Sequence, residues 1–213
     1  INESGFYMNR TTIHRVVWPL LVDAKTVLEL GPGPGTWTKE LMAIAPEATY
    51  DLVDISEKMI EQSKQSLDNK SSIRFFCMDF LDYRPDCKYD LFFSSRAVEY
   101  FSDKRKFVQK VGEVLAKGGK AVIITKMPRY YFYHLVGRPI PQMHRLQIKP
   151  KALEQLFREN GFIINKLTPA SSTIPLLKSA KLNSLAFTIF SHLPWNWVGS
   201  IFTESYCLSV EKP

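Results

Sequence analysis

Three glycines at alternate positions follow an acidic residue near the start of the chain, in the segment "ELGPGPG" from Glu29 to Gly35. An apolar run precedes the segment and a helical pattern follows it, which predicts a tight turn from a strand into a helix. Without side chains in such a turn, a ligand can closely approach the backbone N–H groups. The segment therefore predicts a ligand site, and the alternative is a turn that binds nothing.

A second candidate ligand residue is Asp54, which ends the apolar run "YDLVD" about twenty residues further along the chain. A carboxylate at that place can hold both hydroxyls of a ribose, each hydrogen bond contributing about 1.5 to 3 kcal/mol. The glycines run G-x-G-x-G rather than G-x-G-x-x-G, and Glu29 beside them would repel a phosphate. The pattern thus favours an adenosine-containing ligand that carries positive charge, and it counts against a dinucleotide such as NAD.

These residues must be positioned by elements that alternate between two periods. Short apolar runs, mostly of β-favouring residues, alternate with segments of helical periodicity, so we expect an α/β fold with a doubly wound parallel sheet. Ser56, Ser102 and Pro150 are expected to begin three of the helices. The expected strands are 27–30, 48–53, 73–78, 89–94, 121–125, 162–167 and 204–212.

Taken in order, these segments resemble the motifs of class I S-adenosylmethionine-dependent methyltransferases of the type 11 or type 12 kind. "ELGPGPG" resembles motif I, and "FFCMDFLDY" resembles the segment at strand three. "YDLFFSSRAVEYF" resembles strand four, and "VLAKGGKAVIIT" resembles the turn into strand five, with Ala116 and Lys117 replacing the usual residues. The resemblance covers about residues 27–167.

The resemblance implies a three-layer, Rossmann-like fold with a mostly parallel seven-stranded sheet, an antiparallel last strand and a helical cap insertion. It implies one domain over residues 1–213, with a leader or lid at 1–26, a cofactor-binding core at 27–128, and acceptor-side insertions at 129–149 and 168–203. The implied cofactor is S-adenosylmethionine, with S-adenosylhomocysteine as product, and no metal. The residues implied to bind it are Glu29, Gly31, Pro32, Gly33, Gly35, Asp54, Ile55, Met59, Asp79, Phe80, Ser95 and Tyr7. In this set Asp79 would face the adenine amino group, Phe80 would neighbour the ring, and Tyr7 would lie near the methionine end.

Methyl transfer mainly requires positioning of the acceptor, and a base helps where the acceptor is a hydroxyl or an acidic carbon. The candidate catalytic residues are His144, Arg96 and Glu99. His144 lies in the insertion after strand five and can titrate near neutral pH. Arg96 and Glu99 follow strand four, where they could contact substrate or form an internal pair that only anchors the loop. The D/N-P-P-Y/F motif is absent there, which counts against nucleic acid as the acceptor.

The net charge of +7 lies mostly after residue 128. A basic segment suits an anionic membrane or substrate, or simply favours solubility. An expected helix at 175–193, followed by Trp195 and Trp197, suits a lid that meets a lipid surface or a lipid-linked substrate, and the alternative is a cap packed on the sheet. The three cysteines have no disulfide or zinc-site spacing, which fits a cytoplasmic location with peripheral membrane contact through 175–203 left open.

The function predicted from the sequence is methyl transfer from S-adenosylmethionine to a small-molecule, lipid-linked or glycan-linked acceptor, at oxygen. The alternative is a protein with the same fold that binds a nucleoside or a membrane surface without turnover. The oligomeric state is left open.

Overall fold

The computed structural model describes residues 3–68, 70–128, 137, 139, 145–172, 187–188 and 203–213. Its seven strands form one sheet in the order β3-β2-β1-β4-β5-β7-β6, in which β7 alone runs opposite to the other six strands. The expected seven-stranded, doubly wound sheet with an antiparallel last strand is therefore confirmed. The strands are β1 Thr26–Leu30, β2 Thr49–Asp54, β3 Ile73–Cys77, β4 Tyr89–Ser95, β5 Leu115–Lys126, β6 Ile163–Ser172 and β7 Thr203–Glu211.

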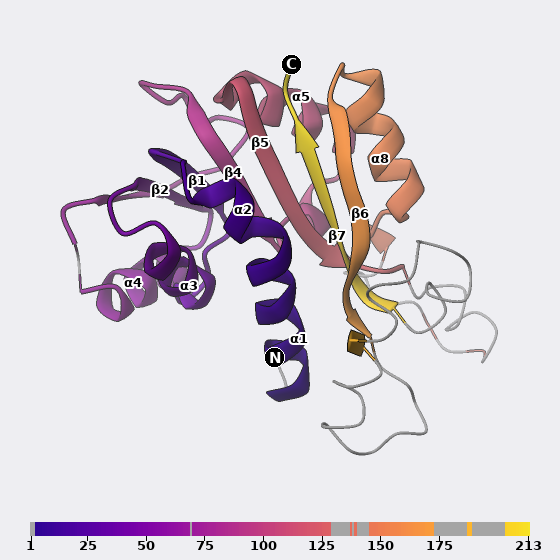
Figure 1. Ribbon diagram of the computed structural model, residues 1–213, viewed down its shortest axis with the longest axis horizontal. Helices are drawn as coiled ribbons and strands as arrows, with labels where there is room; N and C mark the ends of the chain where they lie inside the picture. The colour runs from indigo at the N-terminus through magenta and orange to yellow at the C-terminus, as the bar shows by residue number, and fades with distance from the viewer. Residues whose placement is uncertain are drawn as a thin grey trace.

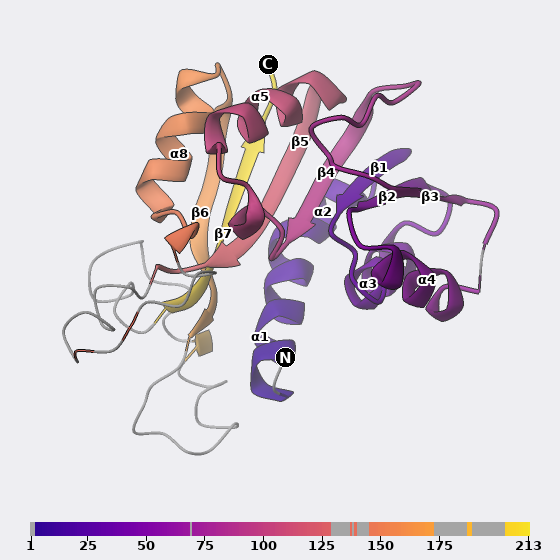
Figure 2. The same ribbon diagram turned by 180° about the vertical axis from the view of Figure 1, so that it is seen from behind.

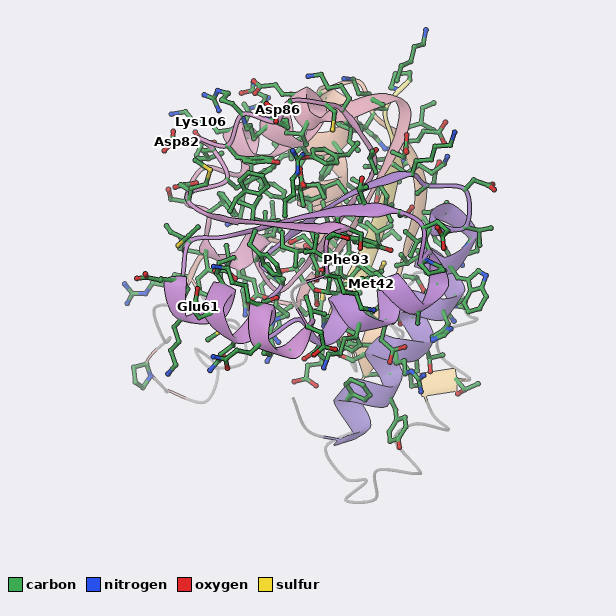
Figure 3. The ribbon with its side chains drawn as sticks, turned by 90° about the vertical axis from the view of Figure 1, so that its left-hand side faces the viewer. Met42, Glu61, Asp82, Asp86, Phe93 and Lys106 are labelled. Carbon is green, nitrogen blue, oxygen red and sulfur yellow. The ribbon has the colours of Figure 1, made fainter. Side chains whose placement is uncertain are left out.

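Helices cover both faces of the sheet (Figures 1 and 2). On one face lie α1, α2, α3 and α4, and on the other lie α5 and α8. Figure 3, seen along the sheet, places Met42 of α3 and Glu61 of α4 below the strands and Lys106 of α5 above them. The bounds are α1 Glu3–Thr12, the π-helical turn Ile13–Val17, α2 Trp18–Leu21, α3 Thr36–Ile44, α4 Glu57–Ser66, a 3-10 turn Val98–Tyr100, α5 Lys104–Val114 and α8 Pro150–Glu159.

Each face has its own apolar core because apolar residues recur at helical spacing on the helices and at alternate positions on the strands. Phe107 and Val111 of α5 and Phe157 of α8 are fully buried against Leu28, Phe92 and other residues of the same face. On the opposite face, side chains of the leader and of α3 pack on β1, β2, β4 and β5; they include Ile13, Val17, Leu21, Trp37 and Leu41.

Polar side chains cap the first turns of α4 and α5. The Ser56 hydroxyl accepts a hydrogen bond from the backbone N of Met59 at 3.4 Å, so the predicted start of α4 is confirmed. The predicted cap Ser102 is wrong by one residue: Asp103 Oδ1 accepts from the backbone N of Arg105 and of Lys106, both at 3.0 Å. A carboxylate at this place also complements the positive end of the helix dipole, which a serine does not.

The segments expected to form the acceptor side lie mostly outside the described residues. Of the helix expected at 175–193, the structure describes Phe187 and Thr188, which are helical, with Phe187 buried. Trp195, Trp197 and His144 lie outside the description. Among the helices described, none is long and apolar enough to cross a membrane.

Candidate functional site

A cavity of about 630 Å³ opens at the carboxyl ends of β1 to β4. The loops that follow these strands meet there because parallel strands place their carboxyl ends at the same edge of the sheet. Of the residues that the sequence predicted to bind a cofactor or a substrate, the cavity is lined by Gly31, Gly33, Asp54, Ile55, Met59, Asp79, Phe80, Ser95 and Arg96. Residues separated by up to 65 positions in the chain are thus brought to one site.

After β1 the turn places Gly31, Gly33 and Gly35 in the left-handed region, and the surroundings of Gly31 and Gly33 differ. Gly31 has φ +69°, and a Cβ there would lie 2.8 Å from the Cβ of Ala97. Gly33 has φ +56°, and a Cβ there would meet no atom within 4 Å. Because Gly33 lines the cavity and has open space beside it, a ligand can approach its backbone closely.

Asp54 ends β2 and Asp79 follows the neighbouring strand β3 by two residues, and both line the cavity together with a third acid, Asp103. Asp54 Oδ1 accepts from the backbone N of Ser56 at 2.9 Å, and Asp79 Oδ1 accepts from the backbone N of Leu81 at 2.8 Å. These bonds fix each carboxylate, and no described residue hydrogen-bonds to its second oxygen, which can therefore accept from a ligand. Phe80 is almost fully buried, with its ring centroid 5.5 Å from that of Phe92, so it forms part of the cavity's apolar wall.

Glu29 lies in β1 below the glycine turn and is only 1% exposed. Its Oε2 accepts from the Thr38 hydroxyl at 2.7 Å. Burial raises the pKa of the Glu29 carboxyl to about 7, although the hydrogen bond from Thr38 opposes this rise. Burial, together with the nearby Glu29, also raises the pKa of Tyr50. Glu29 is not among the residues that line the cavity, so its predicted contact with the cofactor stays a prediction.

Arg96 and Glu99, predicted as substrate or loop-anchoring groups, form an ion pair with 2.8 Å between Arg96 Nε and Glu99 Oε1. Glu99 is buried, and its Oε1 also accepts from the Thr125 hydroxyl at 3.2 Å and from the backbone N of Lys126 at 2.9 Å. The carboxylate therefore ties the loop after β4 to the end of β5. The structure supports the anchoring interpretation for Glu99, whereas Arg96 also lines the cavity.

The remaining predicted residues are placed as follows. Pro32 and Gly35 are buried within the turn, and Gly35 has φ +81° beside the side chains of Ser66 and Leu67. Tyr7, on α1, is about half exposed, and it does not belong to the cavity lining. Sequence reasoning missed two features of the site, the hydrogen bond from Thr38 to Glu29 and the positive φ of Arg96.

The cavity suits an adenosine-containing cofactor. Gly33 offers backbone without side-chain obstruction, Asp54 offers a fixed carboxylate oxygen for a ribose, and Asp79 offers one for an adenine amino group. Ile55, which is 74% exposed at the cavity, provides apolar surface for a ring. The spacing G-x-G-x-G differs from the dinucleotide pattern G-x-G-x-x-G, so the turn does not favour a dinucleotide.

Residues 27–119 match the family of proteins described as "Methyltransferase domain". The matched range begins in β1 and ends in β5, so it contains the glycine turn and the loops that form the cavity. The resemblance to class I S-adenosylmethionine-dependent methyltransferases is therefore confirmed, and the cofactor of that class is S-adenosylmethionine, as the sequence predicted.

Similar proteins include malonyl-[acyl-carrier protein] O-methyltransferase 1 of Ilyobacter polytropus, which is 31% identical over 106 residues, 50% of this chain and 40% of that protein. The trans-aconitate 2-methyltransferase of an Azoarcus species is 31% identical over 111 residues, 52% of this chain and 42% of that protein. The chain thus spans less than half the length of these two relatives. Among solved structures, the N-methyltransferase NodS of Bradyrhizobium japonicum superposes with a TM-score of 0.72, covering 100% of this chain and 98% of that one at 14% identity, which shows the fold alone.

Proposed function

We propose that the protein transfers a methyl group from S-adenosylmethionine to an oxygen of a small-molecule or carrier-linked acceptor. One observation supports S-adenosylmethionine as the cofactor: the fixed carboxylate of Asp54 and the unobstructed backbone of Gly33 line the same cavity. Oxygen as the methylated atom is supported by the names of relatives such as malonyl-[acyl-carrier protein] O-methyltransferase 1. A lipid- or glycan-linked acceptor stays a prediction, because the segment 175–203, from which it was predicted, lies mostly outside the described residues.

When bound, the cofactor supplies an electrophilic methyl group on a sulfonium, and the leaving group is also part of the cofactor. The residues of this chain would bind the cofactor and orient it. Asp54 and Asp79 would hold the ribose and adenine ends, and the backbone at Gly31 and Gly33 would let the methionine part lie close to the sheet edge. Such holding sets the direction in which the methyl group faces the acceptor.

The test is titration calorimetry with S-adenosylmethionine, S-adenosylhomocysteine and NAD on the wild-type protein and on Asp54→Asn. Asparagine keeps an oxygen for the backbone N of Ser56 but removes the charge, so affinity for the first two ligands should fall roughly 10- to 100-fold. Asp86→Asn, at an exposed carboxylate, is the matched control and should bind as the wild type does. Equal affinity of Asp54→Asn and wild type would refute the placement of the ribose.

The alternative of a nucleoside-binding protein without turnover predicts the same calorimetry but a different chemical outcome. Incubation with methyl-labelled cofactor and a panel of carboxylic-acid and alcohol acceptors separates the two. Label in a product supports the enzyme, and tight binding without product across the panel supports the alternative.

A further inference from the structure

Arg96 has an unusual backbone conformation at the end of β4. Its φ is +69°, in the left-handed region that residues with a Cβ enter only at a cost in free energy. Its backbone N donates to the carbonyl of Ile124 at 2.8 Å, which holds the turn in this shape. Glycine or asparagine would satisfy the same backbone more easily, so the backbone does not explain why an arginine stands here.

The side chain of Arg96 is held along one edge and free along the other. Its Nε donates to the buried carboxylate of Glu99, which is itself fixed by Thr125 and by the backbone N of Lys126. Among the described residues, neither terminal Nη group of Arg96 has a hydrogen-bond partner. The side chain is 40% exposed, and the residue lines the cavity. The guanidinium therefore presents a planar, oriented pair of N–H donors at the sheet edge.

Charged side chains of both signs lie around Arg96: the cavity lining also includes Lys106 and the three aspartates Asp54, Asp79 and Asp103. Lys104 is half-buried and donates its Nζ to the carbonyl of Phe101, and Lys126 stands at the end of β5 with its Nζ 3.7 Å from Glu204. Neither lysine belongs to the cavity lining, whose two cations are Arg96 and Lys106. An anionic group is the ligand that would complete the hydrogen bonds of the Arg96 guanidinium.

We propose that Arg96 is a specificity residue that binds the acceptor through a carboxylate group, with Glu99 as the residue that holds the guanidinium in place. The proposal rests on the proposed function, because it names the acceptor class of that same site. A planar guanidinium with two parallel free donors matches a carboxylate bidentately. A carboxylate has about four lone-pair sites, so two oxygens that accept from Arg96 keep electron pairs for the reaction.

The transfer then needs no general base. A lone pair of a carboxylate oxygen forms the new O–CH₃ bond while the S–CH₃ bond breaks and its electron pair goes to sulfur. An anion and a sulfonium become a neutral ester and a neutral thioether, so charge balances and no proton moves. Arg96 loses its anionic partner when the ester forms, which favours release of the product over rebinding of it.

The test is calorimetry on protein saturated with S-adenosylhomocysteine, with malonate, its neutral analogue malonamide, and inorganic phosphate as probes. Malonate should bind to the wild type and bind roughly 10- to 100-fold more weakly to Arg96→Gln, whereas malonamide should not distinguish the two. Arg96→Lys should recover only part of the affinity, because an ammonium lacks the fork of donors.

Arg158→Gln is the matched control. Arg158 also pairs on its own helix with a largely buried carboxylate, that of Glu154, at 2.7 Å, but it lies on α8, away from the cavity lining. Equal binding of malonate to wild type and Arg96→Gln would overturn the proposal, as would phosphate binding as tightly as malonate. S-adenosylhomocysteine affinity reports separately on the proposed function: if it is intact in all variants, a failure of the malonate arm refutes only the role of Arg96.

Discussion

Replacing Glu29 by glutamine should change how the stability of the protein depends on pH. The pKa of this buried carboxyl rises from 4.5 to about 7 on folding, so the folded state binds a proton more tightly than the unfolded state. Stability is then highest below the unfolded pKa and falls as pH rises from about 4.5 to about 7. Because each pKa unit corresponds to about 1.4 kcal/mol, the loss across this window is about 3 kcal/mol.

The assay is urea unfolding of both proteins at pH 5, 6, 7 and 8, with the free energy of unfolding extrapolated to water. Other titrating groups, including the four histidines, contribute equally to both proteins, so the difference between the two curves isolates Glu29. Wild type should lose about 2.5 kcal/mol relative to Glu29→Gln between pH 5 and 8, because the remainder of the loss occurs below pH 5. Parallel curves would refute the reasoning.

Thr38 provides a second check on the same carboxyl. The Thr38 hydroxyl donates to Glu29 Oε2 and stabilises its charged form. Thr38→Val should therefore raise the pKa of Glu29 further and move the pH-dependent loss of stability to higher pH. A shift to lower pH would mean that the hydrogen bond does not act on the charged form.

Three further substitutions should have measurable effects. Gly31→Ala should lower the free energy of unfolding by about 1 to 2 kcal/mol or more and weaken S-adenosylhomocysteine binding, because the new Cβ would lie 2.8 Å from that of Ala97 in a left-handed backbone. Urea unfolding measures the first effect and calorimetry the second, and an unchanged affinity would contradict the role of the glycine turn in binding. Asp51→Asn should cost about 1.5 to 3 kcal/mol, because the buried Asp51 carboxylate accepts two bonds of 2.7 Å from the half-exposed Arg74. A loss under 1 kcal/mol in urea unfolding would show that the pair is dispensable. Asp103→Ala should cost about 1 kcal/mol through loss of the α5 cap, as thermal unfolding would detect, and no change in melting temperature would count against that cap.

The sheet and the cofactor side of the site could be predicted because their signals are local. The strand ends at Leu30 and Asp54 follow from apolar runs that stop at glycine or an acid, and parallel strands then bring these ends together. The same local signals placed the start of α4 at Ser56. They misplaced the start of α5 because Ser102 and Asp103 are both good caps, and only the backbone decides between them.

Features that depend on distant partners could not be read from the sequence. Asp51 looks like an alternating strand residue, yet it accepts hydrogen bonds from Arg74, Tyr83 and Tyr89, and the two tyrosine hydroxyls lie 2.6 Å apart. The residues near Asp51 in the chain do not indicate these partners. The left-handed backbone at Arg96 could not be predicted from the sequence either, because arginine has no preference for that conformation.

The strand order has a consequence for how the chain reaches its native state. β7 lies between β5 and β6, although it follows both along the chain, and it hydrogen-bonds to both along most of its length. Until residues 203–211 leave the ribosome, β5 has one unpaired edge and β6 has no strand partner in the described sheet. Unpaired edges template association with other chains. The cofactor half of the sheet, β1 to β5, is complete earlier. The interval between the synthesis of β5 and that of β7 is therefore when the nascent chain is most prone to aggregate, and when a chaperone would protect it most.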